Sequence, residues 1–340
     1  MAEIRLTQLD GKLPNLALMN LAGWHKARGD GVHFYRGSRG AERHLDEPDY
    51  SRIYASAIFK FSAPLIAKFM QQFPEAIIGG TGTTSRLTVE QLLGGDVSYP
   101  DYSVAPAGFT ASLGFTQRGC RLKCKFCVVP EKEGKPAIAN TIAGIWRGAP
   151  WPKHIHLLDN DFFGQPREAW ETRIAEIRDG DFKVCFNQGL NVRLIDQAAA
   201  EALASIEYRD DGFTRRRLYT AWDNLKDEKI FFRGVDTLQA AGIPASHLMT
   251  YMLIGFDPSE TWERIFHRFN LMVDRGIRPY PMVFDPKRLD LKRFQRWVVT
   301  GLYRAVSFRD YDANRKAYVR DQLSLDLDGR EHNEMPERAS

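Results

Sequence analysis

Apolar residues recur along this chain with two different periods, and segments of the two kinds alternate from the start. In the first 95 residues, short apolar runs of strand length are separated by stretches with apolar residues at helical spacing. Because such alternation favours a doubly wound parallel sheet, we predict a small α/β domain over residues 1–95. The strand-like runs lie at 4–9, 32–35, 53–59 and 76–78, and the helix-like stretches lie at 14–24, 63–72 and 87–93.

The second half of the chain shows the same alternation over a longer stretch. Residues 96–110 are rich in Gly, Pro and Tyr, which predicts a linker. Over residues 111–288, strand candidates alternate with helical stretches in the order of a partial (β/α) barrel. An amphipathic helix within 289–328 is expected to close it, and the polar end, 329–340, has the composition of a disordered tail. The six strand candidates lie at 111–116, 154–158, 183–187, 217–221, 248–254 and 280–284.

Composition excludes some classes of protein and leaves others open. Of the 340 residues, 44% are hydrophobic and 26% are charged, as in ordinary globular proteins. No apolar run approaches the roughly 20 residues that span a bilayer, so we expect no membrane helix. The net charge of +4 permits a nucleic-acid partner without requiring one. The first residues, Met-Ala-Glu-Ile-Arg, lack a signal-peptide pattern, so we expect a cytoplasmic protein.

Three of the four cysteines lie within eight residues, as Cys120, Cys124 and Cys127, with the spacing C-x-x-x-C-x-x-C. They follow the strand candidate 111–116, so they fall on a loop that can turn three thiolates toward one point. Three convergent soft ligands suit an iron-sulfur cluster or zinc, and structural zinc normally has a fourth protein ligand. The sequence offers none nearby, so a zinc site would have to be completed from a distant part of the chain. A disulfide is disfavoured in a cytoplasmic chain with few cysteines.

The spacing, with the aromatic Phe126 directly before the last cysteine, resembles the signature of the radical S-adenosylmethionine (radical SAM) superfamily. The resemblance implies a 4Fe-4S cluster on the three cysteines, with S-adenosyl-L-methionine bound to the open iron. It implies that an electron from the cluster releases a 5′-deoxyadenosyl radical, which takes a hydrogen atom from substrate. The implied fold is the partial (β/α)6 radical SAM barrel.

The resemblance also directs attention to the C-terminal ends of the strands, where barrel active sites lie. Asp159 and Asn160 follow the second strand, where the superfamily places a motif that faces the methionyl amino group of the cofactor. After the third strand, the amides of Asn187 and Gln188 suit ribose hydroxyls, and Arg193 suits a carboxylate. The alternative is that Arg193 and the asparagine two residues before it cap the next helix.

Two later strand ends supply the remaining candidates. Asp223 and Asn224 follow the fourth strand, and we assign them to contact with substrate. Gly255 follows the fifth strand, in a segment similar to the one whose backbone lies against the adenine of the cofactor in the superfamily. Gly255 and Phe126 complete the candidate cofactor-binding residues.

The N-terminal half resembles the flavodoxin-like cobalamin-binding domain that often precedes radical SAM barrels. The D-x-H-x-x-G motif that ligates cobalt in that family is missing, since residues 10–15 contain no histidine. We therefore expect a degenerate relative of that domain without cobalamin. A second loop, 79–85, is rich in glycine and follows a strand, so it forms either a phosphate cradle or a plain tight turn.

The cysteine count limits how many metal clusters the chain can hold, and therefore which reactions it could catalyse. Only Cys185 remains after the motif, which leaves no set of cysteines for a second cluster. A single-cluster enzyme that uses its radical directly on substrate is expected, for an isomerisation, an epimerisation or a bond cleavage. A closer resemblance covers most of the chain and points to radical SAM proteins of bacteriophages and prophages. The segments that carry it are 119–134, 157–160, 186–193 and 221–224.

Some of those phage proteins belong to thymidine hypermodification pathways. The resemblance implies an isomerase that converts N-linked glycyl-thymidine in phage DNA to its carbon-linked isomer, in the cytoplasm of a bacterial host. It implies two partners, DNA carrying a modified thymidine and a reductant protein of the flavodoxin or ferredoxin type. Basic residues from 287 onward are compatible with DNA. The alternatives are a radical SAM enzyme acting on another nucleotide or small molecule, and a non-enzymatic zinc-binding nucleic-acid module.

Overall fold

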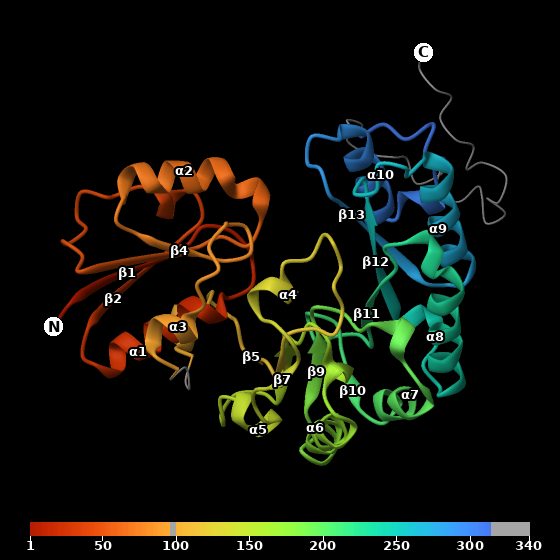
Figure 1. Cartoon of the computed structure of the whole chain (residues 1–340), viewed down its shortest axis with the longest axis horizontal. Helices are drawn as coiled ribbons and strands as arrows, with labels where there is room; N and C mark the ends of the chain where they lie inside the picture. Colours follow the sequence, from red (N-terminus) through yellow and green to blue (C-terminus); the bar gives the residue numbers. More distant parts are fainter. Residues whose placement is uncertain (96–99, 314–340) are drawn as a thin grey trace. The chain divides into compact units, whose positions relative to one another are not determined.

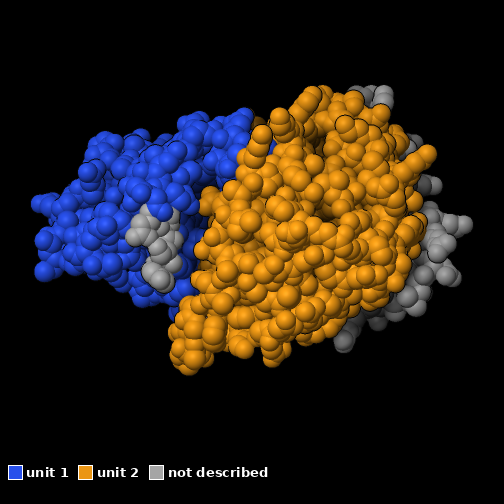
Figure 2. All heavy atoms as spheres, turned by 60° about the horizontal axis from the view of Figure 1, so that its bottom comes forward, with its two compact units in different colours: residues 1–110, 127–134 blue, residues 111–126, 135–340 orange. Residues whose placement is uncertain are grey.

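The chain folds as an α/β protein with several parallel sheets, and its compact part divides into two units. The structure, a computed structural model, describes residues 1–95 and 100–313. The first unit comprises residues 1–110 and 127–134, and the second comprises residues 111–126 and the chain from 135 onward (Figure 2). Part of the expected linker and all of the expected tail at 329–340 lie outside the described residues.

The first unit is built on a four-stranded parallel sheet with the strand order β2-β1-β3-β4 (Figure 1). The chain moves from β1 to one neighbour and then to the other, so the sheet is doubly wound, with its switch point between β1 and β3. All strands and helices expected in this half are confirmed. They are β1 (Glu3–Gln8), α1 (Leu16–Ala27), β2 (Gly31–Arg36), β3 (Arg52–Ser56), α2 (Ala63–Gln72), β4 (Ile77–Gly79) and α3 (Val89–Leu93), with 3-10 turns η1 (Arg39–Ala41), η2 (Lys60–Ser62) and η3 (Tyr102–Val104).

Local chemistry explains where these elements begin. Asn15 caps α1 by accepting a hydrogen bond from the backbone N–H of Leu18, and Thr88 and Gln91 form a capping box at α3. An unexpected feature is Arg5, which is fully buried in the central strand β1. Its guanidinium pairs with Glu47, so the buried charge is neutralised and hydrogen-bonded.

The second unit contains seven parallel strands, six of them expected and one of only two residues, arranged as two sheets rather than a closed barrel. One sheet has the order β10-β9-β8-β5 and the other has the order β11-β12-β13, with a single parallel bridge between Leu190 and Thr220 (Figure 1). All six expected strands are confirmed. The strands are β5 (Ser112–Gly114), β8 (His154–Leu157), β9 (Lys183–Phe186), β11 (Leu218–Ala221), β12 (Leu248–Ile254) and β13 (Arg278–Val283).

Helices and short segments complete this unit. Two short strands, one before the cysteine loop and one after it, form an antiparallel pair. The sequence pattern did not predict this pair. The helices are α4 (Val129–Lys132, assigned to the first unit), α5 (Ile142–Ile145), α6 (Arg167–Asp179), α7 (Gln197–Ala204), α8 (Glu228–Ala240), α9 (Trp262–Asp274) and α10 (Leu289–Val299). The short segments are β6 (Gln117–Arg118), β7 (Ala137–Ile138), β10 (Glu207–Tyr208), η4 (Phe162–Gly164), η5 (Val192–Leu194), η6 (Leu225–Asp227), η7 (Ala245–His247) and η8 (Leu302–Arg304).

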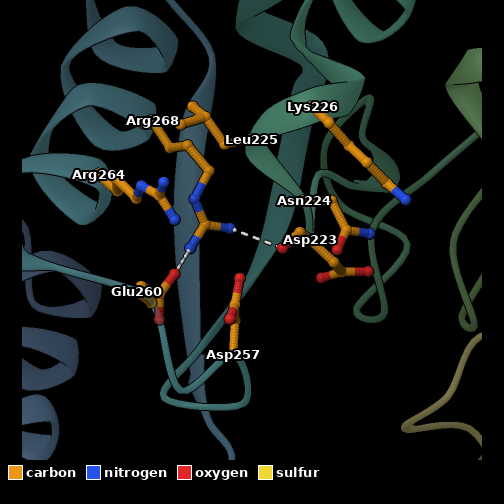
Figure 3. A pocket seen from close by; sticks show the side chains of 8 residues that line it. All are labelled: Asp223, Asn224, Leu225, Lys226, Asp257, Glu260, Arg264 and Arg268. Atoms are coloured by element: carbon orange, nitrogen blue, oxygen red, sulfur yellow. Dashed lines mark hydrogen bonds and ion pairs between the residues drawn. The ribbon is translucent and has the colours of Figure 1, made fainter.

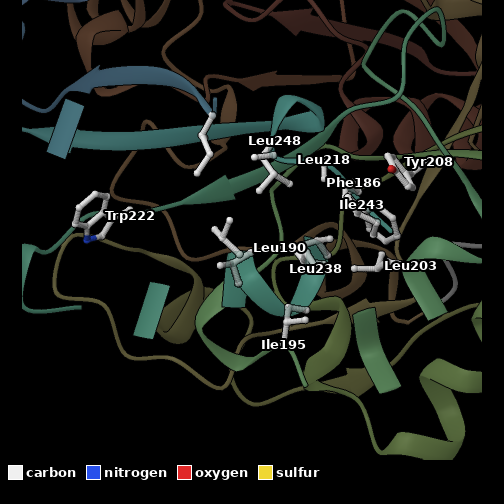
Figure 4. Close-up of a cluster of buried hydrophobic side chains, with 14 of the residues drawn as sticks. Phe186, Leu190, Ile195, Leu203, Tyr208, Leu218, Trp222, Leu238, Ile243 and Leu248 are labelled. Atoms are coloured by element: carbon white, nitrogen blue, oxygen red, sulfur yellow. The ribbon is translucent and has the colours of Figure 1, made fainter. Parts of the chain in front are cut away.

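A continuous apolar core holds the second unit together (Figure 4). Strand residues such as Phe186, Leu218 and Leu248 pack against helix residues such as Leu203 and Leu238, all of them buried. The apolar stripe of α10 joins this core, as its spacing predicted. That stripe consists of Leu291, Phe294, Trp297 and Val298. Within the described residues, the helices are too short or too polar to cross a membrane.

Candidate functional site

The three cysteines of the motif lie on the loop between β6 and α4 and are partly exposed. The backbone N–H of Leu122 lies 3.4 Å from Sγ of Cys120, and that of Val129 lies 3.5 Å from Sγ of Cys127. Cysteine sulfur is a soft ligand of the kind that zinc and iron-sulfur clusters accept. The donor set therefore has the chemistry of cluster ligands. Cys124 and Cys120 fall in the second unit, whereas Cys127 begins the 127–134 segment of the first.

The side chains of the loop are not assembled around a metal ion. Among residues 1–95 and 100–313, no group of three or more His, Cys, Asp or Glu side chains is placed so that it could hold one. Metal-binding segments commonly become ordered on binding, because the ligands rarely preform a site without the metal. The fourth cysteine, Cys185, is buried in β9, where burial raises the pKa of its thiol.

Residues that follow β8 hold the first part of the cysteine loop. Arg121, next to Cys120, donates to Asp161 from Nε at 2.8 Å, from Nη2 at 3.0 Å and from its backbone N–H at 3.2 Å. Asp161 is 4% exposed, so this charge-assisted pairing is largely shielded from water on the carboxylate side. Asp161 therefore fixes the direction in which the chain leaves Cys120.

Asp159, one of the expected cofactor contacts, is turned toward the protein interior. Its Oδ1 accepts hydrogen bonds from the hydroxyl of Thr116, at 3.1 Å, and from the backbone N–H of Gln117. The other oxygen, Oδ2, is buried without a hydrogen-bond partner, as is Oε1 of Gln117. Burial raises the pKa of Asp159 to about 7, although the hydrogen bonds to Oδ1 oppose this shift. Asp159 thus anchors the start of the loop, while its neighbour Asn160 is half-buried.

The expected residues after β9 divide into different environments. Asn187 accepts a hydrogen bond at 2.8 Å from Nδ1 of His156, and Gln188 is exposed. Arg193 donates to Asp227 at 2.6 Å and to Asn191 at 3.0 Å, so its guanidinium is paired within the chain. The alternative that Arg193 and Asn191 cap the next helix is wrong, because Asp196 caps α7 through the backbone N–H of Ala199.

The aromatic residue of the cysteine motif contacts the ends of the last two strands. The ring of Phe126 packs edge-to-face on Phe256, with centroids 5.4 Å apart, and Phe256 packs in the same manner on Phe284. Phe256 directly follows Gly255, which has a φ of +77° that favours glycine. The backbone N–H of Gly255 donates at 2.6 Å to Glu260. The structure therefore brings together two expected residues, Phe126 and the segment of Gly255.

A pocket of about 470 Å³ lies beside the ends of β11 and β12 (Figure 3). It includes both residues expected to contact substrate. Asp223 accepts a hydrogen bond from the backbone N–H of Leu253 at 3.1 Å through Oδ1, and Oδ2 has no hydrogen-bond partner in the described chain. The pKa of Asp223 is raised, chiefly by burial. The lining residues are Asp223, Asn224, Leu225, Lys226, Asp257, Glu260, Arg264 and Arg268.

A buried arginine supports the wall of this pocket. Arg268, 1% exposed, donates to the backbone carbonyls of Trp222 at 3.0 Å and Leu253 at 3.0 Å, and it pairs with Glu260 (Figure 3). Burial lowers the pKa of Arg268, and the charge of Glu260 opposes that shift. Arg268 thereby ties the ends of β11 and β12 to helix α9. The pocket lining carries charges of both signs, including the acidic Asp223 and the basic Lys226.

Sequence reasoning missed the residues that hold these elements in place. Arg268 lies in the middle of the amphipathic helix α9 and Glu260 lies in the loop before it, where charged residues normally face solvent. The signal available was Arg268 itself, a charge between the apolar residues Phe266 and Phe269 on the inward face of that helix. Asp161 directly follows two predicted site residues, Asp159 and Asn160. Its partner, Arg121, could not be predicted from the spacing of residues in the sequence.

Comparison with known proteins adds no assignment. No protein-family model matches the chain, and no curated protein matches it.

Proposed function

We propose that this chain is a radical SAM enzyme whose second unit forms the partial (β/α)6 barrel of that superfamily, and whose first unit is a degenerate cobalamin-domain-like relative. One observation carries the proposal. The C-x-x-x-C-x-x-C loop follows the first of six parallel strands, and its Phe126 packs against the residue after Gly255 at the end of the fifth. Strand ends at this edge are where enzymes with alternating strands and helices place their chemistry.

The residues that would hold the cofactors follow from this proposal. Cys120, Cys124 and Cys127 would ligate a 4Fe-4S cluster, and the edge near Phe126 and Gly255 would receive S-adenosyl-L-methionine. When bound, the pair supplies one-electron chemistry that yields a 5′-deoxyadenosyl radical. The chain's own contribution is to fix the loop through Asp159 and Asp161.

The substrate that we propose is N-linked glycyl-thymidine in DNA, and the reaction is an isomerisation. A hydrogen atom leaves the glycyl α-carbon, the thymidinyl methylene moves from nitrogen to that carbon, and a hydrogen atom returns, so no net oxidation occurs. The mixed charge of the pocket supports a zwitterionic group such as glycyl. The free Oδ2 of Asp223 suits an amine, and the exposed Lys226, unpaired in the described chain, suits a carboxylate.

DNA is the polymer partner that fits this substrate. On the polar face of α10, Lys292 and Arg296 are exposed and have no ion-pair partner among the described residues. In contrast, Arg288 pairs with Asp290, and Arg293 donates to the backbone carbonyl of Phe308, so these two charges are used within the chain. A smaller part of the C-terminal basic region is thus available to phosphates than the sequence suggests.

The decisive test measures 5′-deoxyadenosine formed by anaerobically reconstituted protein with S-adenosyl-L-methionine and a reductant. Glycyl-thymidine DNA deuterated at the glycyl carbon is compared with plain DNA and with no DNA. We expect the carbon-linked isomer only with the modified DNA, and deuterium in any deoxyadenosine released. If S-adenosyl-L-methionine is cleaved slowly at the same rate in all three samples and no isomer forms, the proposed substrate is refuted, whereas the proposed superfamily is not. A colourless protein with about one zinc and no affinity for the cofactor would refute both in favour of a zinc module.

A further inference from the structure

The first unit exposes large apolar side chains at one edge of its sheet. Leu13 follows β1, Ile58, Phe59 and Phe61 follow β3, and Leu87 follows β4. Because the four strands are parallel, the segments that follow them leave the sheet at the same edge, that of the C-terminal strand ends (Figure 1). In doubly wound sheets that edge, beside the switch point, is where ligands bind. We name the surface formed by these five residues the aromatic edge.

The loops that carry the aromatic edge are fixed by hydrogen bonds. Asp10 accepts from the backbone N–H of Ile58 at 2.7 Å, from that of Phe59 at 3.0 Å and from the hydroxyl of Ser62 at 2.6 Å. The glycine-rich loop after β4 packs directly on the same segment, since Gly82 donates its N–H to the carbonyl of Ala57 at 2.9 Å. The exposed side chains are therefore presented by an ordered backbone.

That packing also decides the role of the glycine-rich loop. A Cβ on Gly80 would lie 2.1 Å from the carbonyl oxygen of Ala57, and Gly80 has a φ of +100°. The N–H of Gly82 is already used, and the helix that follows begins only at Val89. The loop is a tight turn that buttresses the aromatic edge, so the phosphate-cradle alternative is not supported.

Two rings of the aromatic edge form a stacked pair in contact with solvent. The ring centroids of Phe59 and Phe61 are 4.9 Å apart with an interplanar angle of 10°, and the residues are 42% and 63% exposed. Exposing two aromatic rings to water is unfavourable, and ordered apolar patches of this kind commonly mark interaction sites. A flat ring that stacks on its neighbour leaves its outer face available to another flat group.

Three positively charged residues lie in the segments that follow β1, β2 and β3. Lys60 lies between the two phenylalanines in the sequence, Lys12 follows β1, and Arg39 follows β2, so all three belong to loops at the same edge of the sheet. Each is exposed and has no ion-pair partner among the described residues. Asp10, an acid that follows β1, is held by hydrogen bonds from its neighbours, and Glu42, which follows η1, pairs with Lys68. The aromatic edge thus combines flat apolar faces with unpaired cations.

We propose that the aromatic edge binds single-stranded nucleic acid, with bases stacked on Phe61 and Phe59 and phosphates beside Lys60, Lys12 and Arg39. Aromatic platforms combined with a basic surface are the usual means of holding single strands, whose bases are free to stack. A duplex does not present its base faces, and an apolar protein partner does not account for the three unpaired cations. The inference concerns binding by the first unit and does not depend on the proposed reaction.

The test uses the full chain without cofactor or reductant, so that it stays separate from the enzymatic assay. Fluorescence anisotropy with a labelled 15-nucleotide oligothymidylate measures affinity for the native protein, Phe59→Ala, Phe61→Ala and Lys60→Ala. We expect each phenylalanine variant to bind about 5- to 100-fold more weakly, as stacking losses do elsewhere. We expect Lys60→Ala to reduce the dependence of log affinity on log salt by about 0.7. Leu45→Ala, an exposed apolar residue of the same unit, and Lys229→Ala, an exposed cation of α8, are the matched controls.

The outcomes separate the proposal from its competitors. Binding of oligouridylate with the same dependence on Phe59 and Phe61 supports the platform, because RNA bases stack in the same manner. Phenylalanine variants that bind within twofold of the native protein, or equal affinity for duplex and single strand, would overturn it. Self-association that is lost in Phe61→Ala, without single-strand binding, would assign the aromatic edge to a second copy of the chain instead.

Discussion

The guanidinium of Arg121 and the carboxylate of Asp161 are joined by two side-chain hydrogen bonds, although 40 residues separate them in the sequence. The pair ties the loop that carries the three candidate metal ligands to the segment after β8. Asp161 is buried and Arg121 is partly exposed, so the pair is only partly screened by water. This relationship gives the proposed cluster site its most direct test.

Replacing Asp161 by asparagine should weaken the loop without changing its ligands. We expect Asp161→Asn to lose about 1–2 kcal/mol of local stability, because a charge-assisted bond becomes a neutral one. Iron bound per protein after anaerobic reconstitution, and the rate of iron loss to a chelator, would report the effect. Glu171→Gln breaks the exposed pair with Arg167 and should leave both measurements unchanged. Equal iron retention in the two variants would show that Asp161 does not position the loop.

Gly164 offers a steric version of the same test. A Cβ at this position would lie 2.4 Å from Oδ2 of Asp161, so Gly164→Ala must displace the carboxylate. We expect a loss of about 1–3 kcal/mol in the free energy of unfolding, the usual range for overpacking, and faster iron loss. Gly212→Ala places its Cβ no closer than 3.8 Å to another atom and should be neutral. Thermal unfolding of both metal-free variants checks the prediction.

Asp159 should make the stability of the metal-free protein fall as pH rises through neutrality. Its pKa of about 7 in the folded chain exceeds the unfolded value of about 3.9, so the folded state holds the proton more tightly. The stabilisation is complete below about pH 4 and declines toward pH 7, by at most about 1.4 kcal/mol per pH unit. Chemical denaturation at pH 5, 6 and 7 would measure this slope. In Asp159→Asn, which keeps an acceptor for Gln117, the slope should flatten; an unchanged slope would exclude Asp159 as its source.

Changes at the pocket should separate substrate handling from cofactor loading. Asp223→Asn keeps an oxygen for the N–H of Leu253 but removes the negative charge facing the pocket. We expect product formation to fall about 10- to 100-fold, corresponding to about 1.4–2.7 kcal/mol in the barrier, with iron content unchanged. Asn224→Ala should act in the same direction, whereas Asp179→Asn, an exposed carboxylate of α6, should have no effect. Unaltered turnover would remove the substituted residue from the substrate site.

Arg268 should be the most sensitive position around the pocket. Arg268→Met leaves Glu260 without its ion-pair partner and three backbone carbonyls without the donor that Arg268 provides, so we expect a loss of about 3–5 kcal/mol in the free energy of unfolding. Combining it with Glu260→Gln should recover part of this loss, because the unpaired buried charge disappears. Arg275→Met, which breaks an exposed pair with Asp236, should cost less than about 1 kcal/mol. Denaturant unfolding of the four proteins provides the comparison.

Periodicity was sufficient to predict the main elements of both units. The strands could be located because parallel strands covered by helices are largely continuous apolar runs, as in Val184, Cys185 and Phe186 of β9. The short pair β6 and β7 was not predicted, since two-residue strands carry no periodicity. Buried charges were missed for a similar reason. Arg5 lies in an apolar strand, but its partner Glu47 is on a polar loop that no pattern distinguishes from solvent-exposed chain.

The candidate site was predicted in part. Spacing located the cysteine loop, and strand order located Asp223, Asn224 and Gly255, because parallel strands end at one edge. Spacing could not predict which polar groups would be consumed inside the protein. Asp159 and Arg193 both stood at the right edge, yet one is buried against Gln117 and the other is paired with Asp227. Whether a polar side chain faces ligand or protein depends on contacts distant in sequence.

The chain crosses between its two units three times, at 110–111, 126–127 and 134–135. No single cut in the gene therefore yields either unit whole. If residues 1–110 were removed, the segment 127–134, which begins at Cys127, would lose the residues that it packs against. Any exchange of the N-terminal part with that of another protein would have to preserve this short excursion.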